Sequence, residues 1–344
     1  MKVFITGGAG FIGINSAHYF LQKGDDVVIF DNFSRIGADA NVKWLSKATK
    51  KNFSVVKGDV CFNQKMMEKG IRGADLVLHL AGQVAVTTSV TNPREDFESN
   101  AFGTFNVLEV LRLLKSKAVF IYSSSNKVYG ELDNLRITEG KTKYLLKDFP
   151  YGVSEKQGLD FHSPYGCSKG AGDQYVHDYS RIYDLNTIVF RQSCIYGPRQ
   201  FGIEDQGWLA WFIIALTYNK KITIFGNGKQ VRDILYVDDL VKAYDLAAKK
   251  ISKTKGRIYN IGGGPANAIS IWLDLKPILE KLFDRKIEVS YKTWRPGDQS
   301  IYVSDIRRSR AEFGWKPTTS VDVGIKKLFN WISKNKEIFE EIHA

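Results

Sequence analysis

The feature that most limits the possible folds of this chain is a strand, glycine-rich turn and helix near its N-terminus. Residues Lys2–Thr6 form a short apolar run with β-branched side chains, which predicts a buried strand. Glycines follow at every third position, as Gly7, Gly10 and Gly13. Residues 14–22 then predict a helix. Glycines at such a turn let backbone N–H groups approach a pyrophosphate at the positive end of the helix. The pattern therefore predicts nucleotide binding.

An acidic residue at the end of the next predicted strand indicates which dinucleotide would bind. Residues 27–30 read Val-Val-Ile-Phe and lead to Asp31, 18 positions after Gly13. A carboxylate at this place can accept hydrogen bonds from both ribose hydroxyls of NAD and would repel a 2′-phosphate. Arg35 tempers this preference, because an arginine can neutralise a phosphate. The pattern favours NAD as the cofactor.

Strands and helices continue to alternate through the first half of the chain. Helical patterns at residues 97–115 and 165–183 lie between apolar strand patterns, which occupy residues 53–56, 76–80, 118–122 and 186–191. This alternation predicts an α/β fold with a Rossmann-type, doubly wound parallel sheet. Ligands bind beyond the carboxyl ends of the strands in such sheets. The residues at these predicted ends are Asp31, Asp59, Ala81, Gly82, Ser125 and Gln192.

The regular alternation weakens from about residue 196. Short strand patterns at 222–225, 258–261 and 287–289 mix with helices and glycine-rich turns. We therefore expect an NAD-binding domain at residues 1–195. A smaller mixed α/β substrate domain is expected at residues 196–344, interleaved with the first and closed by an amphipathic helix from about residue 321. The polar segment 131–163 could form a lid over the substrate or a surface excursion, and both interpretations stay open.

A tyrosine and a lysine carry the strongest chemical signal. Tyr165 and Lys169 are four positions apart, so on a helix they share one face. The ammonium group there can lower the pKa of the phenol and leave a tyrosinate able to take a proton from a sugar hydroxyl. Ser125 lies 40 positions earlier, at the end of a predicted strand. These residues make carbohydrate hydride chemistry the leading hypothesis.

Composition excludes several other classes of protein. The 344 residues are 44% hydrophobic with mixed charges, and the longest apolar run, residues 208–216, is far too short to span a bilayer. The net charge of +12 comes from dispersed lysines, so we expect a solvated surface and no nucleic-acid partner. The five histidines are scattered, so we expect no metal site. The three cysteines form no close pair in the sequence, which predicts that the protein works in a reducing cytoplasm. We expect no association with a membrane.

Together these residues resemble the extended short-chain dehydrogenase/reductases that act on nucleotide sugars, and the resemblance covers nearly the whole chain. It implies that Tyr165 is the base, that Lys169 lowers the pKa of Tyr165 and binds the nicotinamide ribose, and that Ser125 hydrogen-bonds the reacting oxygen. Positions that match the family's NAD contacts are Gly7, Gly10, Phe11, Ile12, Gly13, Asp31, Asn32, Ser34, Arg35, Asp59, Val60, Leu80, Ala81, Asn100, Tyr165 and Lys169.

A narrower resemblance is to a subgroup that epimerises CDP-hexoses at C2. It rests on the strings at residues 30–35, 80–85, 125–130, 160–166 and 199–208. Trp208 could stack on the base or pack in the core, and His162 fits a structural role better than acid–base catalysis. The implied substrate contacts, with Arg232 and Arg295 on phosphate and Asp298 on ribose, are Gln83, Ser125, Asn126, Arg199, Gln206, Arg232, Arg295 and Asp298.

The two residues after Ser125 narrow the reaction. Family members that are 4,6-dehydratases carry an Asp-Glu pair there to expel water, whereas this chain carries Asn126 and Lys127. The remaining reaction is oxidation of C2 to a ketone and reduction on the opposite face, with NAD regenerated in each turnover. The alternatives are a 4-epimerase on UDP- or GDP-sugars, a net reductase and a non-catalytic, NAD-bound scaffold.

The helices predicted at residues 97–115 and 165–183 carry more apolar residues than one buried stripe needs. The family pairs these two helices from each subunit into a four-helix interface. We therefore expect a homodimer or a dimer of dimers, although the additional apolar residues could instead face the sheet.

Overall fold

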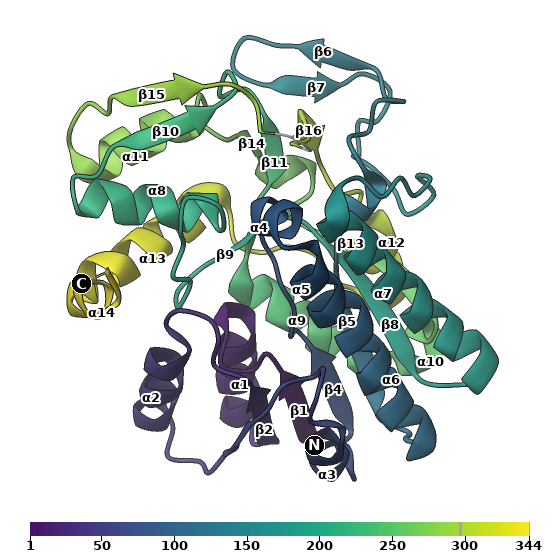
Figure 1. Ribbon diagram of the computed structural model, residues 1–344. Helices are drawn as coiled ribbons and strands as arrows, with labels where there is room; N and C mark the ends of the chain where they lie inside the picture. The colour runs from purple at the N-terminus through teal and green to yellow at the C-terminus, as the bar shows by residue number, and fades with distance from the viewer. Residues whose placement is uncertain (296–297, 344) are drawn as a thin grey trace.

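The chain folds around a seven-stranded parallel sheet, which confirms the predicted α/β class (Figure 1). The computed structural model describes residues 1–295 and 298–343. Along the sheet the order is β13-β8-β5-β4-β1-β2-β3. The strand order reverses between β1 and β4, so the carboxyl ends of the strands open a crevice at that point. The strands are β1 (Lys2–Thr6), β2 (Asp26–Asp31), β3 (Ser54–Lys57), β4 (Leu76–His79), β5 (Val119–Ser125), β8 (Thr187–Gln192) and β13 (Arg257–Ile261).

Helices cover both faces of this sheet because its strands are apolar on both sides. One face packs against α1 (Phe11–Lys23), α2 (Ala38–Ala48) and α9 (Val237–Lys249). The other packs against α3 (Gln64–Ile71), α6 (Gly103–Leu113) and α7 (Ser163–Tyr183). Helix α1 ends at Gly24, whose φ of 93° lies in the left-handed region that glycine adopts without strain.

The helix predicted at residues 97–115 is not one continuous α-helix. It is made of α5 (Pro93–Phe97), a π-helical turn η1 (Glu98–Phe102) and α6. The Thr104 hydroxyl donates a hydrogen bond to the Asn100 carbonyl oxygen at 2.6 Å within the widened turn. Sequence periodicity misses such a turn, because one inserted residue shifts the apolar stripe by only part of a turn. The short helix α4 (Val86–Thr91) lies just before this unit.

Smaller sheets lie beyond the large one, and most of them are drawn in the upper part of Figure 1. They pair β9 (Ile195–Tyr196) with β12 (Leu235–Tyr236), β10 (Ile222–Phe225) with β15 (Val289–Lys292), and β11 (Val231–Asp233) with both β14 (Ala268–Ser270) and β16 (Ile301–Tyr302). The strand predicted at residues 287–289 lies further along the chain in the structure. Strand β15 begins at Val289, so Val289 is the only predicted residue that it contains. The remaining helices are η2 (Asn126–Tyr129), α8 (Trp208–Thr217), α10 (Ile251–Thr254), η3 (Pro265–Asn267), α11 (Leu275–Phe283), α12 (Arg307–Phe313), α13 (Val321–Lys334) and α14 (Lys336–His343).

The second half of the chain also contributes to the large sheet, since β13 pairs with β8. The division into residues 1–195 and 196–344 stays a prediction. A separate apolar core joins α8, α11, α13 and strand β10. Across the described residues, no helix combines the length and apolar character that crossing a membrane requires.

Segment 131–163 contains an antiparallel hairpin of β6 (Ile137–Glu139) and β7 (Tyr144–Leu146). The hairpin packs on the smaller sheets: Ile137, Tyr144 and Leu146 contact a buried cluster around Val231 and Ile301. Lys229 adds an ion pair to Glu139 at 2.7 Å. The segment therefore forms a strap between the end of β5 and the smaller sheets.

Candidate functional site

A cleft with a volume of about 610 Å³ lies at the carboxyl ends of the strands. This volume is in the range of small-molecule and cofactor sites. The cleft brings together the three candidate catalytic residues, four candidate substrate contacts besides Ser125, and nearly all the candidate cofactor contacts. Those that line it are Ser125, Tyr165, Lys169, Gly7, Gly10, Phe11, Ile12, Gly13, Asp31, Asn32, Ser34, Arg35, Asp59, Val60, Leu80, Ala81, Gln83, Asn126, Arg199 and Gln206.

The glycine turn provides the cradle that a dinucleotide needs. Gly7 has a φ of 66°, and a Cβ on it would come within 2.7 Å of the Ala81 backbone nitrogen. A Cβ on Gly13 would lie 2.2 Å from the Gly7 carbonyl oxygen. Helix α1 starts after Gly10, and none of the described side chains caps its first N–H groups. These free donors at a positive helix end fit a diphosphate.

Asp31 is fixed at the end of β2 and is 8% exposed. Its Oδ2 accepts a hydrogen bond from the Ala9 backbone N–H at 3.0 Å, and its Oδ1 accepts one from Phe33 at 2.8 Å. Burial raises the pKa of Asp31, and these backbone hydrogen bonds oppose the rise. Next to it, Asn32 Nδ2 donates to Asp59 Oδ2 at 2.7 Å. The acidic group is thus oriented where the ribose hydroxyls of a dinucleotide would lie.

The candidate catalytic residues come from β5 and α7. Tyr165 is 9% exposed, and burial raises its pKa to about 12, against its hydrogen bond with Ser125. Lys169 Nζ donates to the Ser123 carbonyl oxygen at 2.5 Å and lies 4.4 Å from the Tyr122 ring centroid. Burial lowers the pKa of Lys169 to about 8, although Asp96 and Asp173 oppose this change. The sequence predicts that Lys169 lowers the pKa of Tyr165, but burial has the larger effect and the pKa of Tyr165 is raised.

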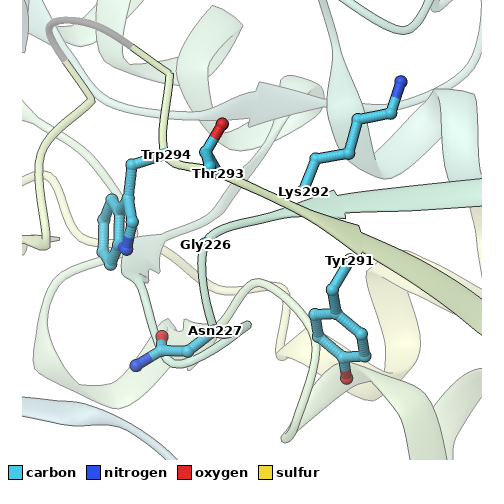
Figure 2. A pocket seen from close by; sticks show the side chains of 6 residues that line it. All are labelled: Gly226, Asn227, Tyr291, Lys292, Thr293 and Trp294. Atoms are coloured by element: carbon cyan, nitrogen blue, oxygen red, sulfur yellow. The ribbon is translucent and has the colours of Figure 1, made fainter.

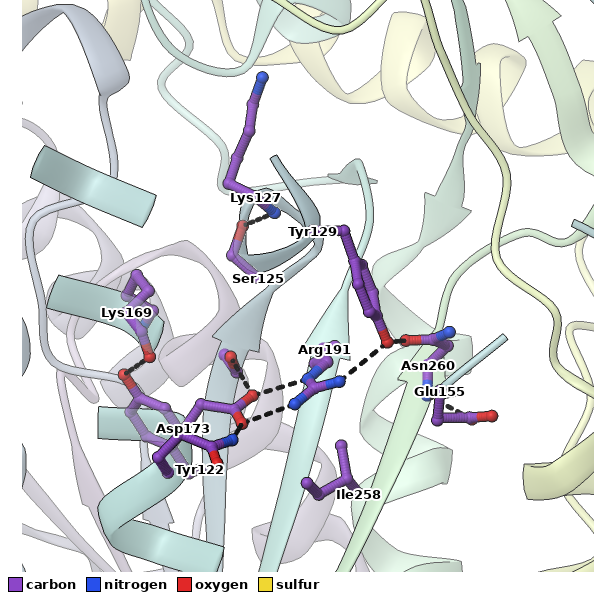
Figure 3. Close-up of polar contacts among 12 residues, drawn as sticks. Tyr122, Ser125, Lys127, Tyr129, Glu155, Lys169, Asp173, Arg191, Ile258 and Asn260 are labelled. Carbon is purple, nitrogen blue, oxygen red and sulfur yellow. Dashed lines mark hydrogen bonds and ion pairs between the residues drawn. The ribbon is translucent and has the colours of Figure 1, made fainter. Parts of the chain in front are cut away.

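A buried ion pair that sequence reasoning missed supports these residues (Figure 3). Asp173 lies one helical turn after Lys169 and accepts two hydrogen bonds from Arg191, both at 2.8 Å. It also accepts one at 2.9 Å from the hydroxyl of Ser124, the neighbour of Ser125. Arg191 donates further to the Tyr129 hydroxyl at 3.0 Å. The i, i+4 spacing from Lys169 is the sequence signal that could have identified Asp173.

Asn100, a candidate cofactor contact, does not line the cleft. It is 1% exposed, and its Nδ2 donates to Asp96 Oδ1 at 3.1 Å. Its Oδ1 is buried without a hydrogen-bond partner among the described residues. A Cβ on Gly82, which does line the cleft, would lie 2.3 Å from that oxygen. Asn100 therefore lies directly behind the cleft wall.

Three candidate substrate residues lie outside the cleft lining and form ion pairs. Arg232 Nη2 lies 2.6 Å from Asp298 Oδ1, and Arg295 Nη2 lies 3.1 Å from Asp205 Oδ1. Arg295 also stacks on the Phe225 ring, with its Cζ 3.8 Å from the centroid. Residues 296 and 297, Pro and Gly of the same motif, lie outside the described residues.

A second, shallower cavity lies at the ends of β10 and β15 (Figure 2). The side chains of Tyr291, Trp294 and Asn227 surround it in Figure 2. It is lined by Gly226, Asn227, Tyr291, Lys292, Thr293 and Trp294.

The residues that replace the dehydratase acid pair have partners of another kind. Asn126 Nδ2 donates to Gln299 Oε1 at 2.8 Å, and Gln299 Nε2 in turn donates to the Gly130 carbonyl oxygen. Burial lowers the pKa of Lys127 to about 8, with nearby Arg232 acting in the same direction. Asn126 lines the cleft, whereas Lys127 is not among its lining residues. Neither side chain can serve as a carboxylic acid, so the two positions after Ser125 do not supply the groups that an elimination of water uses.

The structure also shows where Trp208 and His162 lie relative to the cleft. Trp208 lines the cleft, and its ring packs edge-on against Phe212 at 5.8 Å. His162 is not a cleft residue; its Nε2 lies 3.1 Å from Glu131 Oε1 at the surface. The cleft lining also contains residues that sequence reasoning did not select, namely Asn41, Thr88, Glu95, Ser99, Ile203 and Leu209.

Comparison with known proteins places the chain among nucleotide-sugar enzymes. The family described as GDP-mannose 4,6 dehydratase matches residues 4–328. The chain is 45% identical to the CDP-paratose 2-epimerase of Salmonella typhi, over 97% of this chain and 99% of that protein. It is 32% identical to a putative UDP-glucose 4-epimerase of Methanocaldococcus jannaschii, over 97% of this chain and 99% of that protein.

Solved structures agree with this placement. The UDP-glucuronic acid 4-epimerase of Bacillus cereus, in complex with UDP-glucuronic acid and NAD, superimposes with a TM-score of 0.81 at 27% identity. The match covers 97% of this chain and 99% of that one. The glycine turn, the Ser125–Tyr165–Lys169 cleft and these likenesses lead to one conclusion: this chain belongs to the NAD-dependent nucleotide-sugar epimerase and dehydratase family of extended short-chain dehydrogenase/reductases.

Proposed function

We propose that this protein inverts C2 of a CDP-hexose, interconverting CDP-paratose and CDP-tyvelose or a related pair. The observation that carries the proposal is that Asn126, which lines the cleft beside Ser125, and Lys127 after it stand at the positions where a dehydratase needs two carboxyl groups. The 45% identity to a CDP-paratose 2-epimerase supports the choice of C2, since it exceeds the 32% identity to the putative 4-epimerase.

The glycine turn and Asp31 would hold NAD, which supplies the hydride acceptor. Tyr165 Oη would take the proton of the C2 hydroxyl, and Ser125 would hold the same oxygen by a hydrogen bond. Lys169 would orient the nicotinamide ribose and add positive charge beside Tyr165. Because burial, aided by Asp96, raises the pKa of Tyr165 to about 12, the proton transfer would depend on positive charge brought by the bound ligands.

The reaction would then reverse on the other face of the sugar. The 2-keto sugar turns over within the cleft, hydride returns to C2, and Tyr165 gives back the proton that it took. No water is consumed and no dinucleotide is used up. The buried Asp173–Arg191 ion pair would hold α7 against β8, and the Ser124–Asp173 hydrogen bond would hold α7 against β5, so that the groups on β5 and α7 keep their positions throughout.

The second half of the chain would recognise the nucleotide. Arg232 and Arg295 would bind phosphate oxygens, since a guanidinium fork matches two such oxygens, and Asp298 would bind the ribose. Residues 196–344 would thus serve as the substrate domain. An exposed apolar face on α6 and α7, which includes Leu113 and Ile182, would pair two subunits.

The test is a panel of nucleotide sugars incubated with the purified protein in D2O and followed by NMR. We expect inversion at C2 of a CDP-hexose, no deuterium at C2, and no net change in NADH. Inversion only at C4, elimination of water or stoichiometric consumption of NADH would contradict the proposal. Deuterium at C2 would show that the C2 hydrogen leaves as a proton that exchanges with solvent, and it would contradict hydride transfer.

A further inference from the structure

Arg199 is a cation that is buried at the edge of the cleft, and no carboxylate among the described residues pairs with it. It is 7% exposed and lies in the loop between β9 and α8. Within residues 1–295 and 298–343, no carboxylate forms an ion pair with its guanidinium, and no hydrogen bond from that group is found. Burial is the sole influence on the pKa of Arg199, which it lowers to about 10, so the group stays charged at neutral pH.

Two tryptophans hold this guanidinium in place. Its Cζ lies 4.1 Å from the ring centroid of Trp44, on α2, and 5.3 Å from that of Trp331, on α13. Cation–π contacts recover part of the cost of removing the charge from water, but they supply no acceptor for its N–H groups. The Trp331 indole N–H is also buried without a partner among the described residues. This stack therefore presents several unsatisfied donors.

The elements around Arg199 are those that would bind the dinucleotide. The preceding carbonyl oxygen, of Pro198, accepts a hydrogen bond at 3.0 Å from Asn15 on α1. Phe201 lies against Gly37, where a Cβ would come within 2.1 Å of its ring. Arg232 and Asp298, the candidate groups for the sugar nucleotide, lie outside the lining of this cleft.

We infer that Arg199 is an anion-binding residue for the diphosphate of the dinucleotide, delivered from the second half of the chain. It would complement the N–H groups at the start of α1 with a full positive charge. Because Trp331 belongs to α13, the bound diphosphate would also be linked to the packing of that helix. The inference rests on the proposed binding of NAD and differs from the sequence prediction, which placed Arg199 on the substrate.

The test compares ligands that differ in phosphate, without any sugar substrate. The purified Arg199→Met variant is assayed for the NAD that it retains per chain, and calorimetry then measures its affinities for NAD, ADP and adenosine. Loss of a charged hydrogen-bonding partner predicts roughly 10- to 100-fold weaker binding of NAD and ADP, with adenosine affinity unchanged. The matched control is Arg72→Gln, which removes an exposed arginine that forms an ion pair with Glu68.

Stability provides a second readout. Methionine fills the space between the tryptophans without a buried charge, so we expect the dinucleotide-free variant to keep its melting temperature within a few degrees. If Arg199 were only a structural clamp, the melting temperature would fall while ADP and adenosine affinities kept their ratio, and this would overturn the inference. Should Arg199→Met not fold, Arg199→Gln is assayed in the same way. A failure of C2 epimerisation would leave these binding measurements intact.

Discussion

Arg232 and Asp298 form an ion pair of 2.6 Å between two residues that were each expected to contact a nucleotide. The Arg232 side chain is 8% exposed, whereas that of Asp298 is 25% exposed. The pair joins β11 to the segment before β16, so it fixes the distance between the two groups. In the proposed complex the arginine would turn to phosphate and the aspartate to ribose, which requires the pair to loosen.

Replacing Arg232 should therefore separate phosphate recognition from cofactor binding. For Arg232→Met we expect affinity for CDP to fall roughly 10- to 100-fold, because a charged hydrogen bond is lost, with retained NAD unchanged. Calorimetry with CDP and cytidine measures the effect, and cytidine should be affected least. Arg136→Met, which breaks an exposed pair with Asp148, is the matched control. Unchanged CDP affinity would remove Arg232 from the site.

Removing the Tyr165 hydroxyl should stop proton transfer without emptying the cleft. We expect turnover of Tyr165→Phe to fall by about 10²- to 10⁴-fold, the range for a general base, while NAD content stays the same. Epimerisation followed by NMR and dinucleotide released by acid provide the two readouts. Tyr175→Phe, on an exposed position of the same helix, should retain parental activity. Full activity in Tyr165→Phe would contradict the mechanism.

Lys169 should lower stability near neutral pH. Its folded-state pKa is lowered from 10.5 to about 8, so the folded chain releases this proton more readily than the unfolded chain does. The penalty is fully present below pH 8 and disappears as the pH rises toward 10.5. We expect the free energy of unfolding of Lys169→Met to be higher than that of the parent by on the order of 3 kcal/mol at pH 7. The difference should vanish above pH 10.5, the ordinary pKa of a lysine. Denaturant titrations at several pH values measure it.

A pH-independent difference, or a loss of stability in Lys169→Met, would mean that the hydrogen bond to Ser123 outweighs the burial of the charge. The same variant should turn over substrate more slowly, because the positive charge of Lys169 would no longer help to offset the raised pKa of Tyr165. Stability and activity are thus expected to move in opposite directions at this position.

An exposed apolar face on α6 and α7 should form the subunit contact. Leu113 is 70% exposed and Ile182 is 65% exposed, so two large apolar side chains face outward on these helices. Tyr175, Tyr179 and Tyr183 line up along the same side of α7 with successive ring contacts. We expect the parent to sediment as a dimer or dimer of dimers, and Leu113→Glu combined with Ile182→Glu to sediment as a smaller species.

A control for charge is Val323→Glu, since Val323 is an exposed apolar residue on α13 and remote from this face. Its assembly should equal that of the parent. A parent that sediments as a monomer, or a double variant with unchanged assembly, would show that these residues pack against nothing in solution.

Local patterns were enough to predict much of this protein. The strand, glycine turn and helix at Gly7–Gly13, the acid at Asp31 and the pairing of Tyr165 with Lys169 depend on spacing within one or two elements. Steric needs of a tight turn and the periodicity of a helix act over a few residues, so they can be seen in the sequence. The parallel sheet follows from the same alternation.

Only the tertiary structure decided what surrounds those groups. The ion pairs Arg232–Asp298 and Asp173–Arg191 join residues 66 and 18 positions apart, and Arg199 meets tryptophans from opposite ends of the chain. Burial, which raises the pKa of Tyr165 and lowers that of Lys169, depends on packing by many elements at once. The sequence by itself thus determined the fold class and the chemical groups of the cleft. Folding decided their charge states and partners, because desolvation and ion pairing depend on distances in space and not along the chain.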